Sequence, residues 1–177
     1  MTLQARETFY YNGDELGSFD TPLSTHPKPP KFEPLGSFCW RGYRGTWSIR
    51  DRRLYLVDLY AHIKKLKGIP NYRYIRYDRR RKDIYYEIHI EPTCQPVYIE
   101  DVFPKMKDGK LFAYWFSGDV IFGLGEVTGH GMTCSYKKYL SLTFEHGVLV
   151  KEQIRPHAEI YPPKSIEEML ASIKSIK

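Results

Sequence analysis

Cysteine is scarce in this sequence, and long hydrophobic runs are missing from it. Only three cysteines occur in the 177 residues, at Cys39, Cys94 and Cys134. An odd number at long spacings makes no disulfide framework and no zinc pattern, so we expect buried thiols in a reducing compartment. The longest apolar stretches, such as residues 54–59, are far too short to cross a bilayer, and the first residues lack the apolar core of a signal peptide. These absences predict a cytoplasmic protein that does not enter the membrane.

Aromatic residues, by contrast, are abundant. A chain of this length predicts a single domain, residues 1–177, that buries roughly 70% of its unfolded surface. Aromatic residues make up 15% of it, and 15 of its residues are tyrosines. That number exceeds what a core can use, because each buried hydroxyl needs a hydrogen-bond partner. We therefore expect many of the tyrosines in strands or half exposed at a surface.

The N-terminal third has the alternation and turn signals of β-strands. Residues 7–12 predict a first strand that ends at an Asn-Gly turn. Residues 21–36 contain five prolines and predict an extended surface arm. Residues 38–60 predict a hairpin that turns at residues 50–53, and its second strand is apolar on both faces, as a central strand would be.

The C-terminal half adds further strands and one helix. Residues 111–122 are strongly β-forming, and residues 123–131 predict a glycine-rich loop. Residues 139–144 and 148–154 flank a compact turn and predict a second hairpin. A capping box and an apolar stripe predict a helix over 165–176. The predicted fold is mainly β (α+β), with antiparallel sheets forming a sandwich or partly open barrel and one C-terminal helix.

Positive charge is concentrated in one window, residues 50–82. This window holds 12 basic residues against three acidic ones, a net charge of +9. The rest of the chain holds 15 basic and 18 acidic residues, so it carries −3. Tyrosines are interleaved with the basic residues. Arginine offers a planar fork of donors and tyrosine a rigid, half-polar face, so the combination is typical of a contact surface rather than a catalytic centre.

Part of this window, residues 61–83, reads as a basic tyrosine- and arginine-rich insert. Two strands, 72–78 and 84–90, are predicted to form a hairpin whose tip is residues 79–83. The residues predicted to contact a partner are Arg73, Tyr74, Arg76, Tyr77, Arg79, Arg80, Arg81 and Lys82.

Three sequence blocks outside the insert carry a family resemblance. They are C-W-R-G-Y-R-G-T-W at residues 39–47, L-Y-L-V-D at 54–58 and L-F-A-Y-W-F-S-G at 111–118. Together they resemble a widespread family of small, uncharacterised bacterial proteins, over about residues 36–155. The resemblance implies a bacterial, mainly β, single-domain protein, and it implies no activity, cofactor or catalytic residue. The insert lies between the blocks, where a partner-specific segment on a shared scaffold is expected.

Catalytic candidates exist, and each has a simpler interpretation. Glu87, His89 and Glu91 share one strand face by period two and could bind a metal or exchange protons. A strand face exposed to water has the same pattern and is far commoner. Cys134 with His130 or with His146 could form a nucleophile and base, but no local signature accompanies them. We therefore expect Cys134 to pack.

Two further patterns are also read as structural. The glycine-rich segment 123–131 lacks the Gly-Lys-Ser/Thr ending of a phosphate-binding loop and predicts a plain turn between strands. The carboxylates of Asp58, Asp101 and Asp119 are scattered without a pairing spacing. The sequence thus predicts no catalytic residue, no metal site and no cofactor.

The preferred functional hypothesis is a non-enzymatic module that binds another protein. Its most concrete version is a bacterial immunity protein that neutralises a cognate toxin by binding it. One alternative is a nucleic-acid (RNA) binder that uses the same basic residues, although no known RNA-binding motif is present. Another is an enzyme of unknown class with His89, His130 or Cys134 in a pocket.

Overall fold

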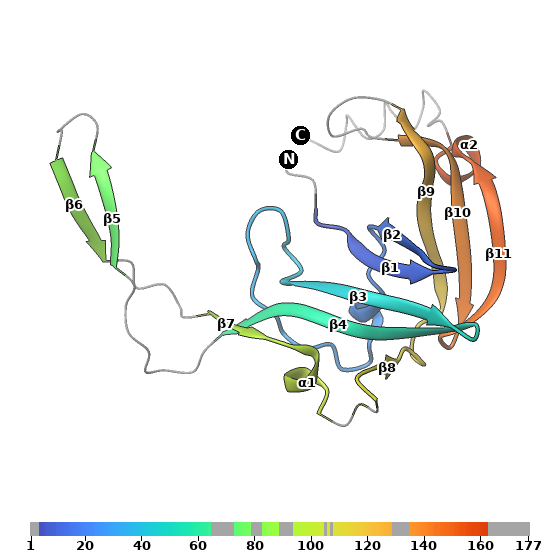
Figure 1. The fold of residues 1–177 in the computed structure, drawn as a ribbon, viewed down its shortest axis with the longest axis horizontal. Helices are drawn as coiled ribbons and strands as arrows, with labels where there is room; N and C mark the ends of the chain where they lie inside the picture. Colours follow the sequence, from blue (N-terminus) through green and yellow to red (C-terminus); the bar gives the residue numbers. More distant parts are fainter. Residues whose placement is uncertain are drawn as a thin grey trace, which may run out of the picture.

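The computed structural model describes residues 4–64, 73–78, 83–88, 94–104, 106, 108–128 and 135–162, and this part of the chain is mainly β-structure (Figure 1). The helices are three short ones, η1 (Pro22–Thr25), α1 (Ile99–Val102) and α2 (His157–Ile160). The predicted helix over 165–176 lies outside the described residues. None of the described helices has the length and apolar character needed to span a bilayer. The strands of the main sheet are β1 (Glu7–Tyr11), β2 (Asp14–Ser18), β3 (Tyr43–Arg50), β4 (Arg53–Lys64), β7 (Cys94–Val97), β8 (Leu111–Phe112), β9 (Gly118–Thr128), β10 (Ser135–Glu145) and β11 (Val148–Pro156).

These strands form one strongly curved sheet in the order β2-β1-β3-β4-β11-β10-β9, with β7 and β8 also paired to β4. Every ladder is antiparallel except that between β1 and β3, which is parallel. A single residue pair, Val148 with Arg53, joins β11 to β4. The sheet therefore has two halves, which run at a steep angle to each other in Figure 1. The predicted mainly β architecture is confirmed, in its partly open form.

The open seam of the sheet lies between the edge strands β2 and β9. Side chains and backbone close it in place of a ladder. The Ser18 hydroxyl donates to the Ile121 carbonyl at 2.7 Å, and the Ile121 amide donates to the Asp20 carboxylate at 2.7 Å. The two edges are thus held together without forming a continuous barrel.

Aromatic side chains fill the space between the two halves. Phe9 of β1 stacks on Trp47 of β3 at 6.0 Å between ring centroids and meets Phe122 of β9 edge-on at 5.2 Å. All three are essentially inaccessible to solvent. Leu140, Leu142 and Phe144 of β10 are also buried. The contact of Phe9 with Phe122 therefore links β1 to β9, two strands that share no ladder.

The predicted hairpin turns are confirmed, and all three have the left-handed backbone that suits a right-twisted hairpin. Each turn uses two central residues with positive φ. The residues are Asn12 (52°) and Gly13 (89°), Asp51 (49°) and Arg52 (57°), and His146 (47°) and Gly147 (76°).

The glycine-rich loop predicted at 123–131 is wrong for its first part. Strand β9 continues to Thr128 and pairs with β10 as far as Ser135. Gly123 is required because an added Cβ would overlap the ring of Tyr136. Gly125 has φ of +78° beside a register shift, where glycine suits a bulge. These glycines serve the sheet rather than a loop, and residues 129–134 lie outside the described part.

The proline-rich arm runs along the body of the sheet and contributes to its core. Leu23 of η1 is 1% exposed, and the indole of Trp115 donates to the Pro22 carbonyl at 2.9 Å. Further on, the Glu33 amide donates to the His62 carbonyl at 2.8 Å. The arm also approaches the main sheet closely at Gly42, where an added Cβ would overlap the Glu33 carbonyl.

Two glycines in equivalent turns provide a matched pair for a stability test. Gly13→Ala places an alanine at positive φ in open space, so we expect a loss of about 1–2 kcal/mol in the free energy of unfolding. Gly147→Ala incurs the same strain and also forces its Cβ against the Ala113 carbonyl. It should cost at least about 1 kcal/mol more. Urea unfolding of both variants measures this difference, and equal losses would contradict the packing assigned to Gly147.

Candidate functional site

The hairpin predicted within the basic insert is present. Strands β5 (Arg73–Asp78) and β6 (Asp83–Ile88) pair antiparallel in a sheet of their own, with Asp78 opposite Asp83 at the tip (Figure 1). Of the predicted contact residues, Arg73, Tyr74, Arg76 and Tyr77 lie in β5. The others, Arg79, Arg80, Arg81 and Lys82, lie outside the described residues.

The register of this hairpin sorts its residues onto two faces. Successive strand residues alternate between faces, and directly paired residues share one. One face holds polar and aromatic positions. The other, apart from Arg73, holds apolar or aromatic positions. The polar face contains Tyr74, Arg76, Asp78, Asp83, Tyr85 and Glu87, and the apolar face contains Ile75, Tyr77, Ile84, Tyr86 and Ile88.

The structure separates the basic window, residues 50–82, into two regions at opposite ends of β4. Arg50, Arg52 and Arg53 lie at the β3–β4 turn, whereas the insert leaves the sheet at the opposite end of β4. These arginines have internal partners. Arg52 donates to the Leu149 carbonyl at 2.6 Å, and the Arg53 guanidinium lies 5.9 Å from the Phe112 ring centroid. Only the part of the window in and around β5 and β6 therefore belongs to the candidate interface.

A second candidate site is a groove on the outer face of the sheet, across the seam between β2 and β9. Its volume is about 230 Å³. Gly17 and Gly123 contribute to its lining and leave room over the strands for larger side chains. The groove is also lined by Arg6, Phe19, Tyr136, Tyr139, His157 and Tyr161.

Sequence analysis did not find this groove, because its lining comes from five separated segments. The excess of tyrosine was the one available signal, since it predicted half-exposed rings at a surface. Tyr161 is 54% exposed and Tyr139 only 6%, so the rings span the range from rim to floor. No spacing along the chain connects them with Arg6.

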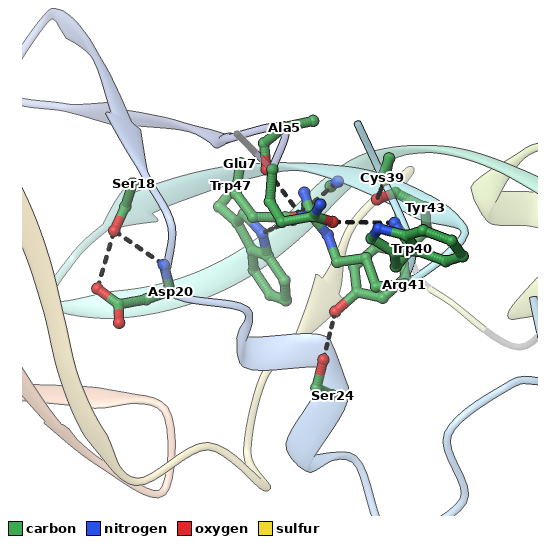
Figure 2. Close-up of polar contacts among 12 residues, drawn as sticks. Ala5, Glu7, Ser18, Asp20, Ser24, Cys39, Trp40, Arg41, Tyr43 and Trp47 are labelled. Carbon is green, nitrogen blue, oxygen red and sulfur yellow. Dashed lines mark hydrogen bonds and ion pairs between the residues drawn. The ribbon is translucent and has the colours of Figure 1, made fainter. Parts of the chain in front are cut away.

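A buried ion pair lies on the inner side of β1 and β3 (Figure 2). The carboxylate of Glu7 is fully buried and lies 2.6 Å from an Arg41 guanidinium nitrogen. Its other oxygen accepts hydrogen bonds from the Gly45 amide at 2.8 Å and the Trp47 indole at 3.0 Å. Arg41 also donates to the Ala5 carbonyl at 2.8 Å. These contacts tie the chain before β3 to β1, which is a structural role.

Burial sets the ionisation of this cluster. Loss of hydration raises the pKa of Glu7, while Arg41, Trp47 and Gly45 each act to lower it. Burial also raises the pKa of Tyr43 to about 12. The Tyr43 hydroxyl therefore stays protonated at neutral pH, 2.8 Å from the Ser24 hydroxyl. Neither group is poised to act as a base on a substrate.

Most of the catalytic candidates lie beyond what the structure describes. These are His89, Glu91, His130 and Cys134, and the side chain of Glu87 is likewise not described. His146 is described, and it lies in the β10–β11 turn, where its amide donates to Ser117. Among the described residues, no group of His, Cys, Asp and Glu side chains could hold a metal ion.

The three scattered aspartates make local structural hydrogen bonds, and Cys39 packs as expected. Asp58 accepts from the Leu59 amide, Asp101 from the Tyr98 amide and Asp119 from the Thr143 hydroxyl. The buried thiol of Cys39 donates to the Tyr43 carbonyl at 3.1 Å. All four side chains therefore have structural hydrogen-bonding roles.

The raised pKa of Glu7 has a testable consequence for stability. Below pH 4.5 the carboxyl is protonated in both the folded and the unfolded state, and its contribution is fully present. As pH rises through the folded-state pKa, the folded state loses a proton that the unfolded state has already lost, so the free energy of unfolding falls. Glutamine does not titrate. The stability advantage of the wild type over Glu7→Gln should therefore shrink between pH 4.5 and neutrality.

Urea unfolding at several pH values measures this difference, with Glu145→Gln in an exposed turn position as the control. We also expect Glu7→Gln to be less stable by about 1–3 kcal/mol near pH 4.5, because a carboxyl has an oxygen facing the N–H donors on both sides, whereas the NH2 of glutamine would face either Arg41 or Gly45 and Trp47. If the stability advantage of the wild type grew with pH instead, the attraction of Arg41 for the Glu7 carboxylate would outweigh the cost of burying its charge.

Comparisons of the whole chain with protein-family models, with curated proteins and with solved structures found no match.

Proposed function

We propose that this protein is a non-enzymatic module that binds another protein through the β5–β6 hairpin. The observation that carries the proposal is the register of that hairpin, which collects Ile75, Tyr77, Ile84, Tyr86 and Ile88 on one face. A two-stranded hairpin is marginal in water unless its apolar face packs against something. This hairpin shares no ladder with the main sheet. A protein partner supplies the missing surface.

The attachment of the insert supports the same conclusion. The chain leaves the main sheet after Lys64 and returns at Cys94, and these two residues pair with each other across β4 and β7. The ladder continues from Lys64 to Ala61 on one strand and from Cys94 to Val97 on the other. The base of the insert is therefore fixed by the β4–β7 ladder of the main sheet.

Charge defines the kind of partner. The tip and the polar face of the hairpin hold arginines and tyrosines, which are enriched among the residues that dominate protein-binding energies, together with the carboxyl residues Asp78, Asp83 and Glu87. The run of four basic residues at 79–82 favours an acidic surface, which it would also steer into place. In its most concrete form, the partner is a bacterial toxin, and the protein is the immunity protein that blocks it.

RNA is the competing partner, and salt separates the two. Binding dominated by phosphates falls steeply with salt, in proportion to the number of phosphates engaged. A protein interface that buries the apolar face of the hairpin depends on salt much less. Affinity capture from a bacterial lysate, with and without ribonuclease, should retain a protein partner in both cases. Recovery of RNA alone would overturn the proposal.

Charge reversal at the hairpin tip is the direct test. The triple variant Arg79→Glu, Arg80→Glu, Arg81→Glu should lose more than about 2 kcal/mol of binding free energy toward the captured partner. Its melting temperature should stay within a few degrees of the wild type, because the tip lies outside the main sheet. The control is Lys137→Glu, Lys138→Glu, Lys151→Glu, which makes the same charge change at exposed strand positions.

Calorimetric titration measures the affinity of both triple variants for the partner, and thermal unfolding measures their stability. We expect the tip variant to lose affinity while it keeps its stability, and the control to keep both. Equal losses of affinity in the two variants would mean that net charge alone, and not the hairpin, attracts the partner.

A further inference from the structure

The groove across the β2–β9 seam has aromatic walls and a size suited to a single ring. Its volume of about 230 Å³ lies below the roughly 300–1,000 Å³ typical of sites for drug-sized ligands. The ring centroid of Tyr139 lies 5.9 Å from that of Tyr136 and 5.5 Å from that of Tyr161. Phe19, which is 46% exposed, adds a ring from the β2 side. The walls can therefore pack against a flat aromatic molecule.

One cation lines this aromatic groove. The guanidinium of Arg6 lies 4.8 Å from the Phe19 ring centroid, and one of its nitrogens is 3.4 Å from the Tyr136 hydroxyl. Within the described part of the chain, no carboxylate lies within ion-pair distance of Arg6. A guanidinium has five N–H donors in a fork that fits a carboxylate. Most of the donor capacity of Arg6 is thus available to an anion.

A hydrogen-bond chain adds polar groups to the groove. The Tyr136 amide donates to the Tyr139 hydroxyl at 3.0 Å, and that hydroxyl lies 3.2 Å from Nδ1 of His157. Nε2 makes no hydrogen bond to any other described residue. The groove therefore offers an imidazole nitrogen in addition to the Arg6 cation.

We propose that this groove is a binding site for a small, single-ring aromatic carboxylate. The ring packs among Phe19, Tyr136 and Tyr161, and the carboxylate pairs with the Arg6 guanidinium. Gly17 and Gly123 make the site possible. An added Cβ at Gly17 would crowd the Arg6 side chain at 3.2 Å, and one at Gly123 would displace the Tyr136 ring. The site is independent of the hairpin and of the partner proposed for it.

The test compares an acid with its neutral amide. Calorimetric titration of the full chain with 4-hydroxybenzoate should give saturable one-to-one binding in the micromolar to low-millimolar range. 4-Hydroxybenzamide has the same ring and shape without the charge, and it should bind at least tenfold more weakly. Absence of binding by the acid at millimolar concentration, or equal binding of acid and amide, would overturn the proposal.

Variants locate the binding. Arg6→Gln should weaken 4-hydroxybenzoate at least tenfold, and Arg6→Lys should fall between it and the wild type, because it keeps the charge without the fork. Arg44→Gln, which changes an exposed arginine on β3 outside the groove, should bind like the wild type. Circular dichroism confirms that each variant is folded. If Arg6→Gln does not fold, Arg6→Lys with Tyr161→Leu decides the matter, and unchanged affinity in both would refute the site.

Discussion

The packing of aromatic side chains between the two halves of the sheet is the interaction on which this fold depends. One ladder pair joins the halves at β4 and β11, backbone hydrogen bonds of Ala113, Phe116 and Gly147 support that junction, and hydrogen bonds around Ser18, Asp20 and Ile121 hold the opposite seam. Backbone bonds at the two margins do not by themselves fix the angle between two sheets. Phe9 contacts Trp47 on one half and Phe122 on the other, so its ring sets that angle. The outer groove inherits its shape from the same geometry, because it lies over the seam.

Residues of the sequence blocks at 39–47 and 111–118 make structural contacts. In the first block, Arg41, Gly45 and Trp47 all bond to the buried carboxylate of Glu7. Gly45 has to be glycine because a Cβ there would overlap that carboxylate. In the second, the Ala113 amide donates to Leu54 and the Phe116 carbonyl accepts from Gly147. Both blocks therefore hold parts of the main sheet together.

Local chemistry made much of the fold predictable. Turn residues such as Asn12 and Gly13 fix a hairpin within four residues, and apolar residues on both faces identified the central strand that is now β4, paired with β3 and β11. The extension of β9 was not predictable in this way. Gly123 resembles a loop residue until Tyr136, thirteen positions later, is seen to occupy the space of its missing side chain. The parallel pairing of β1 with β3 is equally non-local, because neither segment contains a sequence signal that identifies the strand it pairs with.

The two candidate sites also differ in how far they could be predicted from local sequence. The β5–β6 hairpin is contiguous, so its strands and tip followed from one stretch of sequence. The groove is assembled from residues more than 150 positions apart, from Arg6 to Tyr161, and only folding brings them together. Tertiary contacts of this kind leave no periodicity to detect.

The pairing of Lys64 with Cys94 also bears on how such a protein changes over time. Because Lys64 and Cys94 are paired directly with each other, a change in the length or sequence of the span between them leaves the ladders of the main sheet in place. The same junction offers a place for grafting a foreign peptide in the laboratory.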